Sequence, residues 1–473
     1  MKKILIRAGI NPLAPPNDAR IVTRNLIGGN VGNLIYANSV YRTLMVSGDT
    51  ELICDNYSMD ENDAPWINEN CSAYIIPLAD LFRESGKRER NRLRKLVKNL
   101  NIPCIILGVG IRAKNEKEIE NGFSFDKDVK NFVSTVLEKS PMLGLRGELT
   151  GKYLTKLGFR EDKDFMVIGC PSMYTYGARL KRPAGPLNIT KDSAISVNAS
   201  VVATNENLAF VFGILNEYKN SVFLPQRQGE LLTLYTGRDY EHICNKPIYP
   251  IHITDDIYAQ NRVKMFLQAK QWMDFLSTRE LSIGCRMHGN IAAILAGTPT
   301  VIIPHDMRMK ELIDYHKLPS LRPGEIKKCR TLEDVLERVD FNAMFTRHCE
   351  NFERYRKFLE ICGVNNIYAD NDIVETAPYD LALAKLGGDY EVRSAAFASS
   401  EELMHRLTAL DKEKDAVLEE IKQSKIKLKK DFKVLNNTSI KNDLKCLKYK
   451  ISDKVKGVKH TNFEIKQIVS NKE

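Results

Sequence analysis

Apolar and polar positions alternate along the first half of the chain in a way that predicts strands and helices in turn. Short apolar runs predict strands at Lys3–Arg7, Ala73–Pro77, Cys104–Leu107 and Phe165–Ile168. Between the second and third of these, Arg90–Leu100 places its leucines and Val97 on one helical face. Strands that alternate with helices indicate a parallel sheet with helices on both faces.

The same alternation restarts after Lys181–Lys191, whose two prolines and one glycine are typical of a crossing between domains. Further strands are predicted at Ala194–Asn198, Val222–Leu224, Leu281–Gly284 and Thr300–Ile303. Further helices are predicted at Glu206–Tyr218, Arg262–Leu276, Met287–Ala296 and Met309–Tyr315. Two successive α/β sheets predict two Rossmann-like lobes that face a cleft, with ligands beyond the carboxyl ends of the strands.

The pattern changes from Ser399 onward. Ser399 and Glu402 have the spacing of a capping box, which predicts the start of a helix. A four–three spacing then places six apolar residues on one stripe: Leu403, Leu407, Leu410, Val417, Ile421 and Leu428. This stripe predicts a short coiled-coil-like helix. We therefore expect an N-terminal lobe over 1–185, a C-terminal lobe over 186–335, a helical packing segment over 336–395 and a helical, lysine-rich tail over 396–473.

The net charge of +10 belongs to that tail. Residues 421–473 contain 15 lysines, no arginine and five acidic residues, so the other residues are neutral overall. The tail suits a solvated appendage and, equally well, a module for homo-oligomerisation or for contact with an anionic membrane surface. The scarcity of arginine and aromatic residues there argues against a nucleic-acid partner.

No run of 18 apolar residues occurs, and Arg7 and Gly9 interrupt the apolar start of the chain. We therefore expect neither a membrane-spanning helix nor a signal peptide, and a cytoplasmic protein whose basic tail suits the inner face of the membrane. Ten cysteines are scattered singly, without a CxxC pair. This spacing predicts neither a disulfide framework nor a metal site.

Candidate chemistry gathers in Leu281–Lys317, where Arg286 and His288 lie between a predicted strand and a predicted helix. The helix N-terminus offers free N–H groups and positive potential, suited to a phosphate or a carboxylate. Arg286 can hold an anion in a bidentate way, and a histidine can exchange a proton near neutral pH. The alternative, equally open from residue types alone, is that Arg286 caps a carbonyl and His288 is a core residue.

Several segments in order resemble the polysaccharide pyruvyl transferase family. The strand, the R-x-H turn and the following A-x-x-x-G-x-P resemble its C-terminal signature. Other family-like segments are Ile27–Leu44 (an N-x-G-D segment), Ile102–Ile111 (G-x-G), Leu145–Phe159 (R-[DE]-x-x-[ST]), Val167–Met173 (G-D-P) and His305–Lys310 (an acidic-to-lysine turn). The chain departs from the family at two positions, with Asn33 and Cys170 where many members have Asp.

The resemblance implies a GT-B-like transferase that moves pyruvate from phosphoenolpyruvate onto a sugar as a ketal. The acceptor would belong to a cell-surface polysaccharide or exopolysaccharide of the cell envelope, or to its lipid-linked or nucleotide-linked precursor. Phosphoenolpyruvate is then a donor substrate, and no cofactor or metal is expected. Two alternatives stay open, a nucleotide-sugar glycosyltransferase of the same architecture and a non-catalytic glycan-assembly protein.

The resemblance implies His288 as general acid/base, with Arg286 on the donor's carboxylate or phosphate. The expected substrate-binding residues are Asn30, Gly32, Asn33, Gly108, Gly110, Arg146, Arg227 and Lys310. Several have a structural alternative: Asn30, Gly32 and Asn33 could form a tight turn, Gly108 and Gly110 could serve packing, and Arg146 could pair with Glu148 at the surface. His305 and His316 are expected to be structural.

Overall fold

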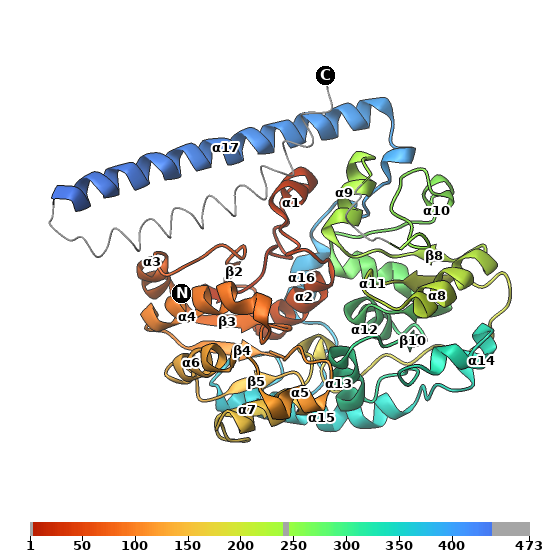
Figure 1. Ribbon diagram of the computed structural model, residues 1–473, viewed down its shortest axis with the longest axis horizontal. Helices are drawn as coiled ribbons and strands as arrows, with labels where there is room; N and C mark the ends of the chain where they lie inside the picture. Colours follow the sequence, from red (N-terminus) through yellow and green to blue (C-terminus); the bar gives the residue numbers. More distant parts are fainter. Residues whose placement is uncertain (1–2, 240–245, 438–473) are drawn as a thin grey trace. The chain divides into compact units, whose positions relative to one another are not determined.

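The computed structural model of the protein describes residues 3–239 and 246–437 (Figure 1). The chain forms two compact units, Met1–Leu407 and Thr408–Glu473. The predicted lysine-rich segment beyond residue 437 lies outside the described residues. Among the described residues, no helix is both long enough and apolar enough to cross a membrane.

The first lobe is built on a parallel sheet in the order β2-β1-β3-β4, next to a parallel pair β5-β6. Its strands are β1 (Lys3–Ile6), β2 (Leu52–Cys54), β3 (Cys71–Pro77), β4 (Cys104–Leu107), β5 (Leu143–Leu145) and β6 (Phe165–Val167). Its helices are α1 (Asp18–Arg24), α2 (Gly32–Leu44), α3 (Ala64–Asn70), α4 (Lys87–Asn99), α5 (Glu116–Asn121), α6 (Asp126–Leu137) and α7 (Glu148–Lys156). Apolar residues of α4 and α6 pack on Ile76 and Ile106 of the sheet, which explains the helical face seen in the sequence.

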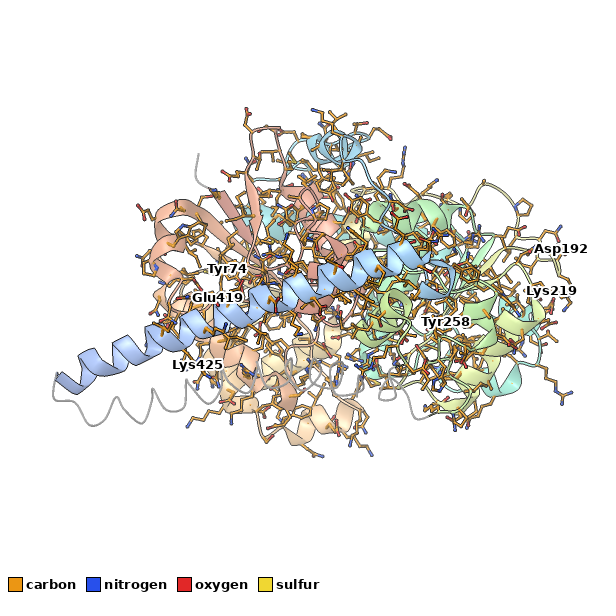
Figure 2. All side chains as sticks on the ribbon, turned by 90° about the horizontal axis from the view of Figure 1, so that it is seen from above. Tyr74, Asp192, Lys219, Tyr258, Glu419 and Lys425 are labelled. Atoms are coloured by element: carbon orange, nitrogen blue, oxygen red, sulfur yellow. The ribbon has the colours of Figure 1, made fainter. Side chains whose placement is uncertain are left out.

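The second lobe repeats the plan with a parallel sheet in the order β10-β9-β7-β8. Its strands are β7 (Ile195–Asn198), β8 (Val222–Phe223), β9 (Leu281–Gly284) and β10 (Thr300–Ile302). Its helices are α8 (Asn205–Glu217), α9 (Gln228–Thr236), α10 (Asp256–Ala259), α11 (Ala269–Ser277), α12 (Met287–Ala296) and α13 (Met307–His316). In Figure 2, Tyr74 marks the interior of the first lobe and Tyr258 that of the second, and both are fully buried.

The chain then runs through α14 (Leu332–Leu336) and returns to the first lobe through α15 (Ala343–Ile361). On the first lobe, Arg354 of α15 donates to the carbonyl of Val167 (2.8 Å). Helix α16 (Pro378–Ala384) and the long α17 (Ser400–Asn437) follow. Short 3-10 helices lie at η1 (Glu84–Gly86), η2 (Pro171–Tyr174), η3 (Glu325–Lys328) and η4 (Ala395–Phe397).

The predicted α/β class is confirmed, with two parallel sheets and a C-terminal helical extension. The backbone N–H of Glu402 donates to the hydroxyl of Ser399 (3.1 Å), as the capping spacing predicted. Both lobes belong to the same compact unit, so the domain boundaries proposed from the sequence stay predictions.

The prediction of a helix over Arg262–Leu276 is wrong in its first seven residues, because α11 begins only at Ala269. Extended pairing replaces the expected helical turns: Val263 forms a bridge with Phe223, and Phe266 forms one with Glu391. The apolar spacing of this segment serves two different neighbours and not one helical face.

Arg42 ties α2 to the C-terminal part of the first unit. Its side chain is 1% exposed, and its guanidinium binds the carboxylate of Asp380 (2.9 Å). It also donates to the carbonyls of Thr175 (2.7 Å) and Val374 (2.7 Å) and to the hydroxyl of Tyr368 (2.9 Å). Because the opposite end of α2 lies against the site described below, Arg42 fixes the helix that supports that site.

We expect Arg42→Met to lower the free energy of unfolding by about 3–5 kcal/mol, because it leaves buried acceptors without a partner. Urea unfolding followed by circular dichroism measures this loss. The matched control is Arg356→Met on α15, whose side chain is 36% exposed and pairs with Glu353 and Asp372. Exposed ion pairs contribute little, so the control should lose less than about 1 kcal/mol. Equal losses in both variants would contradict the anchoring role of Arg42.

Candidate functional site

The R-x-H turn joins the end of β9 to the start of α12, and Asn198 at the end of β7 holds it in place. The amide oxygen of Asn198 accepts the backbone N–H of Arg286 (2.7 Å), and its amide nitrogen donates to Asn290 (2.8 Å). Gly284 is required here because a Cβ would lie 1.9 Å from the carbonyl oxygen of Asn198. Two adjacent strands thus set the direction in which α12 begins.

Arg286 is the N-cap residue of α12, and only some of its guanidinium N–H groups have acceptors within the protein. Its Nε donates to the carbonyl of Ala199 (3.1 Å). Its Nη2 is buried and has no hydrogen-bond partner among the described residues. A buried donor without a partner is unfavourable, so this nitrogen is available to a ligand acceptor.

Arg146, directly after β5 of the first lobe, lies close enough to His288 for its charge to act on the imidazole. Its side chain is 6% exposed, and neither Nε nor Nη2 has a partner among the described residues. Its backbone N–H donates to the carbonyl of Val109 (2.9 Å), and a Cβ at Gly110 would lie 3.2 Å from its Cδ. Two guanidiniums from opposite lobes therefore each keep buried N–H groups unused.

His288 lies half-buried in the first turn of α12, against the first lobe. The ring of Tyr36 in α2 stacks on the imidazole with centroids 5.9 Å apart. A Cβ at Gly32 would lie 2.8 Å from the Cβ of His288, so glycine permits the close approach of α2. The Sγ of Cys170, directly before η2, lies 3.7 Å from Nε2 of the imidazole. The structure thus brings together the predicted residues Gly32 and His288 and Cys170, the position at which many family members have Asp.

Burial and the positive charge of Arg146 lower the pKa of His288 to about 3, although the carboxylate of Asp80 acts in the opposite direction. His288 is therefore neutral at pH 7 when no ligand is bound. His305, expected to be structural, has a buried side chain whose two ring nitrogens have no hydrogen-bond partner among the described residues, although the Asp306 carboxylate lies 3.6 Å from Nε2. Burial lowers the pKa of His305, Asp306 acts in the opposite direction, and Arg308 and Arg286 add to the lowering.

An acidic residue that the sequence analysis missed gathers further arginines beside the site. The Asp80 carboxylate, in the loop after β3, binds Arg83 (2.9 Å), Arg112 (2.6 Å) and Arg308 of α13 (2.5 Å). Burial alone would raise the pKa of Asp80, but the arginines outweigh it and lower the pKa to about 2. Because Arg308 belongs to the second lobe, this ion pair joins the two lobes.

Four of the predicted binding residues make contacts that stabilise the fold itself. The side-chain oxygen of Asn30 accepts the N–H of Gly32 (2.7 Å), and the amide of Asn33 donates to Ile27 (2.8 Å), as in a tight turn. Arg227 is the N-cap residue of α9, and its backbone pairs with Asn30. Lys310 pairs with Asp314 along α13. Their roles as ligand contacts stay predictions, and none of them contacts His288 in the described hydrogen bonds.

Gly108 and Gly110 differ in what they do. Gly108 has a left-handed φ of +65°, and a Cβ there would lie 2.2 Å from the hydroxyl of Tyr36. It therefore serves the packing of α2 against the end of β4, the structural alternative noted from the sequence. Gly110 instead leaves room for Arg146, so it shapes the site indirectly.

Glu311 is a second residue that sequence reasoning missed, and it caps α7 from the other lobe. Its Oε1 accepts the backbone N–H and the hydroxyl of Thr150 (both 2.7 Å), whereas Oε2 is buried without a partner among the described residues. A Cβ at Gly147 would lie 2.3 Å from the Cγ of Glu311. Burial raises the pKa of Glu311 to about 7. The carboxyl group is thus partly protonated at neutral pH.

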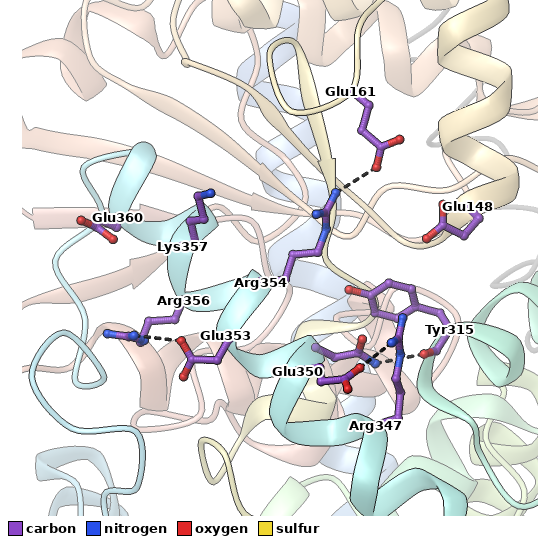
Figure 3. Close-up of a pocket in the computed structure, with 11 residues that line it drawn as sticks. Glu148, Glu161, Tyr315, Arg347, Glu350, Glu353, Arg354, Arg356, Lys357 and Glu360 are labelled. Carbon is purple, nitrogen blue, oxygen red and sulfur yellow. Dashed lines mark hydrogen bonds and ion pairs between the residues drawn. The ribbon is translucent and has the colours of Figure 1, made fainter.

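Residues of α13 take part in the lining of two cavities. One, of about 640 Å³, is lined by charged residues of α15 together with Glu148, Glu161 and Tyr315. Figure 3 shows several of its charges in pairs, among them Arg354 with Glu161 and Arg356 with Glu353. The other, of about 340 Å³, is lined by Lys310, Glu311 and Asp314 among others. Within residues 3–239 and 246–437, no group of His, Cys, Asp and Glu is arranged to hold a metal ion.

We expect the stability of the protein relative to Glu311→Gln to fall as the pH rises from about 4.5 to about 7. A carboxyl group whose pKa is raised on folding stabilises the fold below its unfolded pKa, and this contribution is lost as the pH rises through the folded pKa. The expected difference is about 3 kcal/mol at most. Urea unfolding of both proteins at pH 5 and pH 8 measures it. Parallel pH dependences would show that Glu311 is not a buried, proton-binding carboxyl group.

Solved structures show only a distant similarity to the chain. A putative UDP-N-acetylglucosamine 2-epimerase from Listeria monocytogenes is 11% identical, with 76% of this chain and 95% of that chain covered and a TM-score of 0.39. An Anabaena protein solved with UDP and glucose is 12% identical, with 76% and 100% covered and a TM-score of 0.39. A functionally uncharacterised Klebsiella pneumoniae protein is 13% identical, with 67% and 89% covered and a TM-score of 0.32. Similarities this weak carry no argument about activity.

No curated protein matches the chain. The sequence model of one family, polysaccharide pyruvyl transferase, matches residues 30–307. This range runs from the turn before α2 to the start of α13 and includes Arg146, Arg286 and His288. The match covers more than half of the chain and agrees with the resemblance seen in the motifs. The chain belongs to the polysaccharide pyruvyl transferase family.

Proposed function

We propose that the protein transfers the pyruvyl group of phosphoenolpyruvate to a sugar as a cyclic ketal. Membership of the family supports a pyruvyl transferase. The observation that carries the choice of donor is that Arg146, whose charge acts on His288, and Arg286, two residues before His288, each keep buried N–H groups unused. Phosphoenolpyruvate bears a carboxylate and a phosphate on one carbon, and two such anions match two guanidiniums.

The N-terminus of α12 adds to this positive environment. The first N–H groups of a helix have no partner within it, and the helix dipole favours negative charge there. Arg286 is the N-cap residue of α12 and His288 lies within its first turn, so both belong to the helix end that favours an anion. In this proposal Arg146 holds one anionic group of the donor and Arg286 the other.

Bound anions change the protonation of His288. The pKa of the free imidazole is lowered by burial and by Arg146, and a negatively charged donor offsets both effects. His288 then takes up a proton as the donor binds and delivers it to C3 of the double bond. The positive charge that develops at C2 is stabilised by the donor's own carboxylate and by the fixed polar groups of the site.

The remaining steps restore the starting state. A sugar hydroxyl adds to C2 and releases its proton to His288, which acts as general base. The bond between C2 and the phosphate oxygen breaks, and phosphate leaves. A second hydroxyl of the same sugar attacks C2 and closes the ketal, and its proton is released. The proposal includes a lipid-linked or nucleotide-linked acceptor and contact of the lysine-rich tail with the inner face of the membrane.

We expect purified full-length protein, given phosphoenolpyruvate and a panel of sugar acceptors, to release phosphate and add the mass of a pyruvate ketal to one acceptor. Phosphate release and acceptor mass are followed together. His288→Ala should lower turnover at least about 100-fold, since it removes the general acid/base. Arg356→Met, on the outer face of α15, is the control that should retain turnover.

Two results would overturn the proposal. Sugar transfer from a nucleotide-sugar donor without consumption of phosphoenolpyruvate would establish a glycosyltransferase. Absence of phosphoenolpyruvate binding in calorimetry, together with no product on any acceptor, would remove the donor and favour a glycan-assembly protein.

A further inference from the structure

The Cys170 thiol is the protein group that lies within hydrogen-bonding distance of the His288 imidazole. Its Sγ lies 3.7 Å from Nε2, and the cysteine is fully buried. The backbone N–H of Cys170 donates to Nε2 of His316 (2.9 Å). This bond and the buried position fix where the thiol lies, so the contact with His288 follows from the fold.

The protonation of the imidazole decides the direction of this hydrogen bond. A neutral imidazole has one N–H donor and one acceptor nitrogen, and a thiol is a weak donor and a weak acceptor. Because a thiol carries its own hydrogen and the imidazole is neutral, the S–H can donate to the Nε2 lone pair. The imidazole proton then resides on Nδ1.

The other groups that face His288 do not compete for Nε2. The hydroxyl of Tyr36 donates to the carbonyl of Leu107 (2.7 Å), with the carbonyl of Leu78 also nearby (3.1 Å), and its ring only stacks on the imidazole. Arg146 is cationic and disfavours a second proton on the ring. Asp80 favours such a proton, but its carboxylate is held by three arginines.

We infer that Cys170 is a positioning residue that holds His288 as the neutral Nδ1–H tautomer and so directs an N–H donor to bound substrate. Among the described residues, no hydrogen-bond acceptor is paired with Nδ1, so this group is available to a ligand. The contact between Cys170 and Nε2 rests on the structure alone. The use of the Nδ1–H group toward the anionic donor rests on the proposed function.

This arrangement lets an uncharged histidine recognise an anion. The free site already contains the unpaired guanidiniums of Arg146 and Arg286, and a third permanent positive charge there would be unfavourable. A neutral Nδ1–H supplies a hydrogen bond without that charge. Nε2 then becomes the nitrogen that takes up a proton when the donor binds.

The test is long-range ¹H–¹⁵N spectroscopy of the full-length protein with ¹⁵N-labelled histidine, with the His288 signals assigned by their loss in His288→Asn. At pH 7 the wild-type signals should be those of the Nδ1–H tautomer. Cys170→Ala should shift His288 toward Nε2–H, the form that free histidine side chains favour. Cys104→Ala, which removes another fully buried thiol at the start of β4, should leave the His288 signals unchanged.

Cys170→Asp tests the same contact in the opposite sense. A carboxylate at this position accepts a hydrogen bond, so His288 should become Nε2–H and its pKa should rise by about one to three units. If Cys170→Ala does not fold, the wild-type spectrum still decides: an Nε2–H tautomer there would overturn the inference, as would a Cys170→Ala spectrum identical to wild type.

These spectra separate the inference from the proposed function, because they require no turnover. Titration with phosphoenolpyruvate should move the wild-type His288 signals. An Nδ1–H tautomer that does not respond to phosphoenolpyruvate would leave the role of Cys170 intact and overturn the proposed donor.

Discussion

Two buried guanidiniums without sufficient partners are the constraint on which the site depends. Arg146 and Arg286 each keep N–H groups away from water and from protein acceptors. Such burial is unfavourable unless an acceptor is supplied, and the natural acceptor for two arginines is an anion. The fold maintains this state with rigid supports. Asn198 orients the start of α12, and Gly110 leaves the space that Arg146 occupies.

The two lobes must keep their relative positions for the arginines to share one ligand. Two carboxyl groups cross between them near the site. Asp80 of the first lobe binds Arg308 of α13, and Glu311 of α13 caps the start of α7. The arginines around Asp80 lower its pKa to about 2. Burial raises the pKa of Glu311 to about 7, and the hydrogen bonds from Thr150 and the charge of Arg146 only partly offset it. These two contacts join the lobe that carries Arg146, directly after β5, to the lobe that carries Arg286, two residues after β9.

Many of the strands and helices, and three of the site residues, could be predicted from the sequence because they depend on local structure. The strand β9 and the helix α12 agree with their predicted bounds to the residue, since an apolar strand followed by a helix that Gly297 ends has a clear local signature. Arg286 and His288 follow the end of β9 and Arg146 follows the end of β5, and in a parallel sheet such positions lie at the carboxyl edge where ligands bind. The stretch 262–268 was mistaken for helix because pairing with distant residues decided its conformation.

The partners Asp80, Glu311 and Cys170 could not be assigned in the same way. Each of these residues contacts a residue that is distant in the sequence. A single sequence contains no signal that identifies such a contact. Helix α13 begins at Met307, before its predicted start at Met309, which places Arg308 in its first turn, on Asp80. The sequence analysis assigned Lys310 to the site and not Arg308. The sequence contains no signal that favours one of these two basic residues over the other.

The most direct test is calorimetric binding of phosphoenolpyruvate to the wild-type protein and to Arg146→Met, Arg286→Met and the double variant. If both guanidiniums hold one donor, each single variant should bind about 10- to 100-fold more weakly, because a hydrogen bond to a charged group contributes about 1.5–3 kcal/mol. The double variant should show no measurable binding. Wild-type affinity in either single variant would contradict the account, since the unpaired guanidinium would then have a purely structural role.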